Sequence, residues 1–165
     1  MTKYVFLFIF TFSLLSACNS DESTTYYLIR HAEKDRTDKT NRNPNLNEKG
    51  IKRSDKWATY FKKIDLDAVY STIYNRTMQT AKPTSDSKKL EIKKYDPSKM
   101  YDAIFQTATK GKTVLVVGHS NTTPALVNKI LGENKYEDIN DNDNASLYIV
   151  TITGDKRTCR IEKVE

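Results

Sequence analysis

The chain has 165 residues, of which 38% are apolar and 29% charged, with only 5 Gly and 4 Pro. This composition excludes a disordered or fibrous protein, two cysteines are too few for a disulfide scaffold, and the length predicts one domain. The net charge of +6 fits an anionic substrate or surface, but the basic residues are scattered, so we expect no nucleic-acid partner.

The first 17 residues have the pattern of an export signal. Lys3 makes the start positive, and the uncharged, mostly apolar stretch that follows is shorter than the roughly 20 residues that a membrane span needs. The stretch ends in Leu15-Ser16-Ala17-Cys18, which resembles the lipobox of bacterial lipoproteins. In that motif the signal is cut before the cysteine, and the cysteine carries the lipid. The resemblance implies a signal peptide over residues 1–17 and lipid attachment at Cys18.

The segment after this motif is short and polar, so we predict a lipidated tether over residues 18–24 and a folded domain over residues 25–165. A lipid on Cys18 implies a lipid-anchored membrane protein of the bacterial cell envelope. Asn19 is not the Asp that retains many enterobacterial lipoproteins in the inner membrane, which weakly favours the outer membrane. Two alternatives stay open, namely an ordinary signal peptide with an incidental cysteine and an uncleaved anchor.

Behind the tether, the hydrophobic pattern alternates between the periods of strands and helices. Apolar positions at Ile51, Trp57 and Phe61 have a helical period, whereas Thr113–Val117 is a continuous apolar run typical of a buried parallel strand. This alternation predicts an α/β fold, a single three-layer domain with a mostly parallel central sheet flanked by helices. In chain order we predict strand 26–30, helix 47–62, strand 68–71, helix 77–87, strand 91–95, helix 97–108, strand 113–117, helix 122–131, and a hairpin of strands 146–152 and 158–164.

Two short patterns look like ligand-binding loops but lack residues that such loops need. Gly111-Lys112-Thr113 looks like the end of a phosphate-binding P-loop, yet Gln106 stands where that loop has glycine. The acidic stretch 138–144 looks like a calcium loop, yet Asp143 stands where its turn has glycine. We interpret both as turns and solvated loop.

The chain has 2 histidines, and each follows a predicted strand. His31 comes after strand 26–30, and His119 comes after strand 113–117 through Gly118. Functional residues gather at the carboxyl ends of the strands in α/β sheets, so the fold can bring this pair together. One histidine at a strand end is most often a structural residue, but two at equivalent ends favour a functional site. Without a cysteine cluster they make a poor metal site, so no metal is expected.

Four sequence blocks resemble the histidine phosphatase superfamily, the phosphoglycerate-mutase-like proteins. They stand in the family's order and cover nearly the whole predicted domain. Each block alone is weak, but the four together identify the chain as a member of the family. The blocks are Leu28-Ile29-Arg30-His31-Ala32-Glu33, Leu46-Asn47-Glu48-Lys49-Gly50, Tyr70-Ser71-Thr72-Ile73-Tyr74-Asn75-Arg76-Thr77-Met78-Gln79-Thr80-Ala81 and Val116-Val117-Gly118-His119-Ser120.

The resemblance implies that His31 is phosphorylated on a ring nitrogen. A neutral imidazole can act as a nucleophile near neutral pH because its ordinary pKa is about 6.5. Arg30 and Arg76 would clamp the phosphoryl group, since a guanidinium offers forked and permanently charged donors. His119, when protonated, and the backbone N–H of Ser120 would add further donors. This stabilisation is electrostatic and requires no metal or other cofactor.

The acid that protonates the leaving oxygen is predicted from its position alone. In the family a carboxylate after the third strand often has this role, and Asp96 follows strand 91–95. The alternative is that Asp96 caps a helix that begins at Pro97, because Asp before Pro is a favoured helix start. Glu33 is a minor candidate, and it and Lys34 either line the rim of the pocket or lie in solvated loop.

The resemblance and the signal together predict a phosphomonoesterase, a phosphoric monoester hydrolase, that acts on a small phosphorylated substrate in the cell envelope. The domain is similar in size to minimal phosphohistidine phosphatases and has little room for the lid segments of larger members. Export argues against a cytosolic signalling or glycolytic role. The alternatives are a phosphoglycerate-mutase-like phosphotransferase and a non-catalytic lipoprotein that binds a phosphate ligand.

Overall fold

The computed structural model describes residues 22–165, which form one six-stranded sheet with the strand order β3-β2-β4-β1-β5-β6. Strands β3, β2, β4 and β1 run parallel, whereas β5 and β6 form an antiparallel hairpin beside β1. The predicted α/β fold with a mostly parallel central sheet is therefore confirmed. The strands are β1 (Ser23–Arg30), β2 (Ala68–Ser71), β3 (Ile92–Lys94), β4 (Thr113–Gly118), β5 (Ser146–Thr153) and β6 (Lys156–Lys163).

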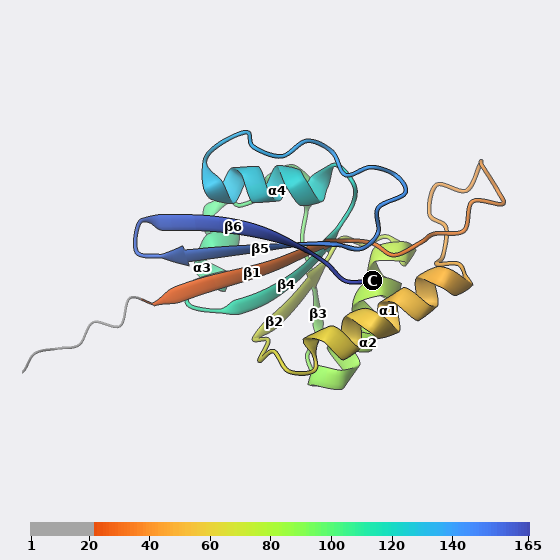
Figure 1. The fold of residues 1–165 in the computed structure, drawn as a ribbon, viewed down its shortest axis with the longest axis horizontal. Helices are drawn as coiled ribbons and strands as arrows, with labels where there is room; N and C mark the ends of the chain where they lie inside the picture. The colour runs from red at the N-terminus through yellow and green to blue at the C-terminus, as the bar shows by residue number, and fades with distance from the viewer. Residues whose placement is uncertain (1–21) are drawn as a thin grey trace, which may run out of the picture.

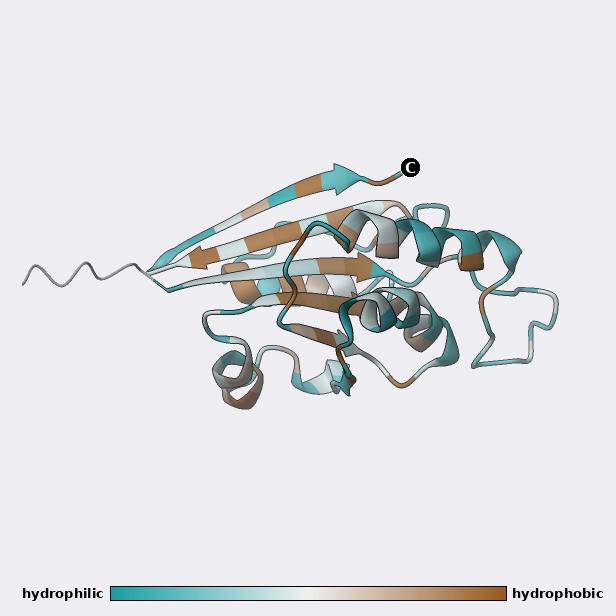
Figure 2. Cartoon of the chain, turned by 90° about the horizontal axis from the view of Figure 1, so that it is seen from below, coloured by the Kyte–Doolittle hydropathy of each residue, from teal (hydrophilic) through white to brown (hydrophobic). Residues whose placement is uncertain are grey.

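Helices cover both faces of the sheet, as Figure 1 shows, with α1 and α2 on one face and α3 and α4 on the other. Alternation along β4 divides the core between these faces. Val114 and Val116 pack toward α4, while Leu115 and Val117 pack toward α1 and α2. In Figure 2 the central strands are accordingly mostly hydrophobic, while α1 is mostly hydrophilic. The helices are α1 (Glu48–Phe61), α2 (Asn75–Lys88), α3 (Ala103–Thr109) and α4 (Thr122–Leu131), and a 3-10 turn, η1, spans Pro97–Lys99.

The predicted helix over 97–108 is wrong as one continuous element. The chain forms η1, then passes through Tyr101 with a left-handed φ of 58°, and only afterwards starts α3. Asp102 caps that new start by accepting a hydrogen bond from the backbone N–H of Phe105. A left-handed residue cannot continue a right-handed helix, so one apolar pattern is divided into two short helical pieces.

Two other predicted bounds also shift. Helix α2 begins at Asn75, before the predicted 77–87, and contains Pro83. Strand β1 begins at Ser23, within the segment predicted as tether, and Thr24 is already buried. The pairing of Ser23 and Thr24 with β5 explains this extension, because a local polarity pattern carries no information about a strand partner 130 residues away.

The sheet places the two histidines at one edge. β1 and β4 are direct parallel neighbours, with Arg30 in register with Gly118. The backbone N–H of His31 donates to the carbonyl oxygen of Gly118 over 2.9 Å. The carboxyl ends of these two central strands therefore bring His31 and His119 together.

Within residues 22–165, no helix combines the length and the apolar character needed to cross a membrane. The predicted signal peptide and Cys18 lie outside the described residues. Cys159, on β6, is a half-buried free thiol that packs against the core beneath α4.

Candidate active site

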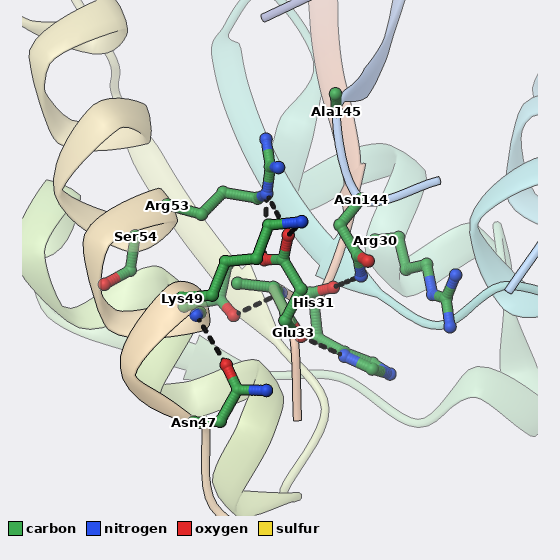
Figure 3. A network of polar contacts seen from close by, with 12 residues as sticks. Arg30, His31, Glu33, Asn47, Lys49, Arg53, Ser54, Asn144 and Ala145 are labelled. Atoms are coloured by element: carbon green, nitrogen blue, oxygen red, sulfur yellow. Dashed lines mark hydrogen bonds and ion pairs between the residues drawn. The ribbon is translucent and has the colours of Figure 1, made fainter. Parts of the chain in front are cut away.

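His31 leaves the end of β1 with its imidazole held in one orientation. Its Nδ1 lies 2.7 Å from the carbonyl oxygen of Ala32, and since a carbonyl only accepts, Nδ1 carries the hydrogen of the neutral ring. The side-chain amide of Asn144 donates to the carbonyl oxygen of His31 (Figure 3). The backbone N–H of Ala32 donates to Thr80 Oγ1. The lone pair of the neutral imidazole therefore lies on Nε2.

Burial keeps this imidazole neutral. The side chain is only 4% exposed, and desolvation, followed by the charges of Arg30, His119 and Arg76, lowers the pKa of His31 to about 3. The hydrogen bond to Ala32 opposes this shift but does not cancel it. At neutral pH the ring is thus neutral and is surrounded by cations.

His119 lies beside His31 at the end of β4, with the two ring centroids 5.5 Å apart and the rings at 68°. Its Nε2 lies 2.9 Å from Thr72 Oγ1, and its backbone N–H donates to Thr122 Oγ1. Burial, then the charges of Arg76 and Lys34, lower the pKa of His119 to about 4. Because a bound anion favours the charged form of a neighbouring group, a phosphate here would raise that pKa and turn the ring into a donor.

Arg30, the last residue of β1, is 3% exposed and is held by the loop between α4 and β5. Its Nη1 donates to the carbonyl oxygens of Asn140 and Asp143, and its Nη2 pairs with the carboxylate of Asp141 at 2.7 Å. Asp141 also pairs with Arg36. Burial alone would raise the pKa of Asp141, but the charges of Arg30 and Arg36 hold it below its ordinary value.

Arg76, in the first turn of α2, is held in a different way. Its guanidinium carbon lies 4.4 Å from the centre of the Tyr74 ring, and its Nη1 donates to the carbonyl oxygen of Arg42. Its Nε is buried without a hydrogen-bond partner, and the guanidinium forms no ion pair within residues 22–165. Arg76 therefore keeps its full positive charge available to an anion.

These groups surround a cavity of about 330 Å³ at the carboxyl edge of the sheet. A second hollow of about 500 Å³ lies alongside and shares several wall residues. Lys34 lines both, and burial, together with the charges of Arg36 and Arg76, lowers its pKa. The wall of the first cavity includes Arg30, His31, Lys34, Tyr74, Arg76, Pro97, His119, Ser120, Asn121, Thr122 and Asp141.

Five of the six predicted site residues of the folded domain thus line one cavity, and Asp96 does not. Its carboxylate accepts hydrogen bonds from the backbone N–H and the hydroxyl of Ser98, which caps η1 and lowers the pKa of Asp96. It borders a neighbouring hollow with Tyr95 and Lys99. Glu33 faces α1, where Arg53 pairs with its carboxylate at 2.9 Å (Figure 3).

Several residues of the site had no distinguishing signal in the sequence. Thr72 and Tyr74 lie within the arginine block, but their side-chain roles depend on the turn between β2 and α2. Asp141 and Asn144 lie in the acidic stretch that we predicted as solvated loop. Asp141 is exposed, as predicted, but pairs with Arg30, whereas Asn144 is buried and the prediction is wrong for it. Their contacts join residues more than 100 positions apart, which a local pattern does not reveal. Within the described chain no group of three His, Cys, Asp or Glu side chains is placed to hold a metal ion.

Comparisons with known proteins bear on the sequence pattern and on the fold. The model of the histidine phosphatase superfamily (branch 1) matches residues 26–97, which include Arg30, His31 and Arg76. No curated protein matches the sequence in a direct search. Residues 26–97 therefore match the pattern of this superfamily, and the predicted fold is in place around them.

Solved structures show how widely this fold is shared. A phosphoglycerate mutase from Bacillus anthracis has a TM-score of 0.65 and 16% identity, over 88% of this chain and 94% of that one. The protein histidine phosphatase SixA, complexed with tungstate, has a TM-score of 0.65 and 16% identity, over 84% of this chain and 96% of that one. A mutant phosphoserine phosphatase from Entamoeba histolytica, in complex with phosphoserine, has a TM-score of 0.66 and 12% identity, over 86% of this chain and 97% of that one. At these identities the likeness establishes the fold.

Proposed function

We propose that this chain is a phosphomonoesterase that works through a phosphohistidine on His31, without a metal ion. The observation that carries the proposal is the state of His31. Its Nδ1 hydrogen is bound to Ala32, it is neutral at physiological pH, and it lies in one cavity with Arg30, Arg76 and His119. A neutral nucleophile among fixed cations suits attack on a dianionic phosphoryl group.

In the first step of the proposed reaction, His31 Nε2 attacks phosphorus and the ester P–O bond breaks. Arg30 and Arg76 compensate the charge on the phosphoryl oxygens, and His119, once protonated beside the anion, donates to the same oxygens. The leaving oxygen takes a proton and departs as an alcohol. In the second step, water attacks the phosphohistidine, the N–P bond breaks, and inorganic phosphate leaves.

We propose that the leaving-group proton comes from Asp96. This role requires that the carboxyl leaves Ser98 and takes up a proton. In the described structure it is bound to Ser98 and its pKa is lowered. Asp96→Asn separates the two roles. A selective loss on alkyl phosphates, with aryl phosphates spared, would assign the acid to Asp96, because a poor leaving group depends most on protonation. Equal activity on both classes, or equal loss with a lower melting temperature, would leave it as the cap of η1.

The proposal is tested by phosphate release from a panel of small phosphomonoesters, with purified full-length chain in detergent and EDTA present. We expect turnover by the wild type and a loss of at least about a thousandfold in His31→Ala, since removal of a nucleophile abolishes the covalent route. Release of phosphate that returns only with added metal would contradict the proposal. An added acceptor alcohol tests for transfer, because a phosphotransferase would yield a new ester in place of inorganic phosphate.

We further propose that the protein is anchored in the cell envelope by a lipid on Cys18, with the outer membrane weakly favoured. The lipobox-like sequence supports this. Ser23 begins β1 and Arg30 ends it (Figure 1), so about 23 Å of extended strand separate the tether from the site. Cys18→Ala should abolish metabolic labelling with a fatty acid, and unchanged labelling of that variant would contradict the anchor.

A further inference from the structure

The two arginines of the site are positioned by opposite means. Arg30 is fixed by a carboxylate and two backbone carbonyls, so part of its charge is already compensated. Arg76 has one carbonyl contact, from Arg42 over 3.3 Å, and no carboxylate partner within the described residues. Its side chain is nevertheless partly buried, and burial with the nearby charge of Arg30 lowers its pKa. Something other than an ion pair has to hold this cation in place.

The Tyr74 ring is the contact that remains. The guanidinium carbon of Arg76 lies 4.4 Å from the ring centre, within the range of a cation–π interaction. The same ring meets His119 edge-on, with centroids 5.1 Å apart and the planes at 89°. Tyr74 thus contacts the second arginine and the second histidine at once, and it lines the cavity that they share.

The backbone fixes where this ring can lie. Tyr74 is the residue that precedes α2, and its carbonyl oxygen accepts hydrogen bonds from the backbone N–H groups of Thr77 and Met78 and from the Thr77 hydroxyl. Its neighbour Ile73 is 69% exposed and does not line the cavity. The position of the Tyr74 ring therefore follows from the start of the helix that also carries Arg76.

We infer that Tyr74 is a positioning residue, a neutral aromatic ring that orients Arg76 for an incoming phosphoryl group. The same ring also orients His119, which it contacts directly. The inference rests on the proposed function, because that function has Arg76 bind the phosphoryl group. A ring face attracts a guanidinium without accepting its N–H hydrogens, so the edge of Arg76 stays free to donate to oxygens. A carboxylate in the same place would orient the arginine but would compete with the substrate for its charge.

The test is a double-mutant cycle of Tyr74 and Arg76. Two quantities are measured, the affinity for inorganic phosphate by calorimetry and kcat/KM. Tyr74→Leu should weaken phosphate binding and lower kcat/KM by roughly 5- to 30-fold, the range of a partly desolvated cation–π contact. Tyr74→Phe retains the ring and should stay within about twofold of wild type. In the Arg76→Ala background, Tyr74→Leu should have little further effect, because its partner is gone.

Ile73→Ala is the control, a more exposed neighbour outside the cavity, and it should leave both readouts unchanged. The inference would be overturned if Tyr74→Phe lost as much as Tyr74→Leu, or if the loss were the same with and without Arg76. A wild type that binds phosphate but hydrolyses no ester would contradict the proposed function alone, since the binding cycle would still decide the role of Tyr74. A wild type that binds no phosphate would overturn both.

Discussion

Asp141 lines the same cavity as Arg30 and pairs with its guanidinium. Its carboxylate bridges Arg30 and Arg36, yet its side chain is 66% exposed, so the bridge is an accessible contact. Arg30 does not depend on it, because the carbonyl oxygens of Asn140 and Asp143 also hold the guanidinium. We therefore expect the carboxylate to act mainly as an anion that competes with phosphate for Arg30.

We predict that Asp141→Asn binds inorganic phosphate several-fold more tightly than wild type, because the competing charge is removed while Arg30 stays in place. Stability should change by less than about 1 kcal/mol, as is usual for exposed ion pairs. Isothermal calorimetry at low salt measures the affinity. Asp138→Asn, in the same loop without an ion pair in the described structure, controls for the change in net charge. Weaker phosphate binding by Asp141→Asn would show that the carboxylate orients Arg30 after all.

At the residue scale, the sequence predicts the residues that line the cavity better than the residues that hold them in place. Arg30, His31, Arg76 and His119 follow from four ordered blocks, and all four line one cavity. The carboxylate on Arg30 and the amide on the His31 carbonyl come from residues over 100 positions away. Such contacts arise from the three-dimensional fold, and an acidic loop that supplies them has the same local pattern as one that faces only solvent.

Helix α1 packs against the loop that follows His31 through a close backbone contact. Asn47 caps the helix by accepting from the backbone N–H of Gly50, and its own N–H donates to the carbonyl oxygen of Glu33. A Cβ on Gly50 would lie 2.1 Å from that same carbonyl oxygen. Glycine is required here because the helix passes directly against the backbone that follows His31.

We predict that Gly50→Ala lowers the free energy of unfolding by about 1–3 kcal/mol, the usual cost of overpacking, and also lowers kcat/KM. The loss of activity follows because Glu33 lies two residues after His31. Gly132→Ala is the control, since its left-handed φ of 78° gives a cost of about 1–2 kcal/mol far from the site. Urea unfolding and kinetics on both variants check this. A Gly50→Ala variant with wild-type kinetics would contradict the coupling of α1 to the site.

At the element scale, patterns with one strong physical cause are predicted well. The apolar run 113–117 becomes β4, and the turn at Gly154-Asp155 joins the β5–β6 hairpin. The interval 97–108 fails because its apolar residues have a helical period, whereas Tyr101 adopts a left-handed φ that periodicity does not register. The pattern of apolar residues predicts that a helix or strand is present. A break within it depends on the backbone conformation of a single residue, which that pattern does not show.

The buried histidines make the stability of the whole molecule sensitive to mild acid. Burial first, then neighbouring cations, lowers the pKa of His31 to about 3 and that of His119 to about 4. In the unfolded chain both take up a proton near pH 6.5. Between these values the unfolded state binds more protons, so the free energy of unfolding falls as the pH falls.

We predict a loss on the order of 2 kcal/mol from His31 between pH 7.5 and pH 5. Urea unfolding at the two values measures it. His31→Gln, which cannot titrate, should show a smaller loss over the same interval. Asp143 does not interfere, since its pKa of about 2 affects stability only at lower pH. An equal loss in wild type and His31→Gln would contradict the neutral, buried state of His31.

The most direct test of the account is to trap the covalent intermediate. Full-length protein would be mixed with a phosphomonoester carrying radioactive phosphorus, in EDTA, quenched in alkali and mapped by peptide. We predict label on His31, stable in alkali and labile in acid as a phosphoramidate is, and absent from His31→Ala. Label that survives acid, label on another residue, or turnover that continues in His31→Ala would contradict the assignment of His31 as the nucleophile.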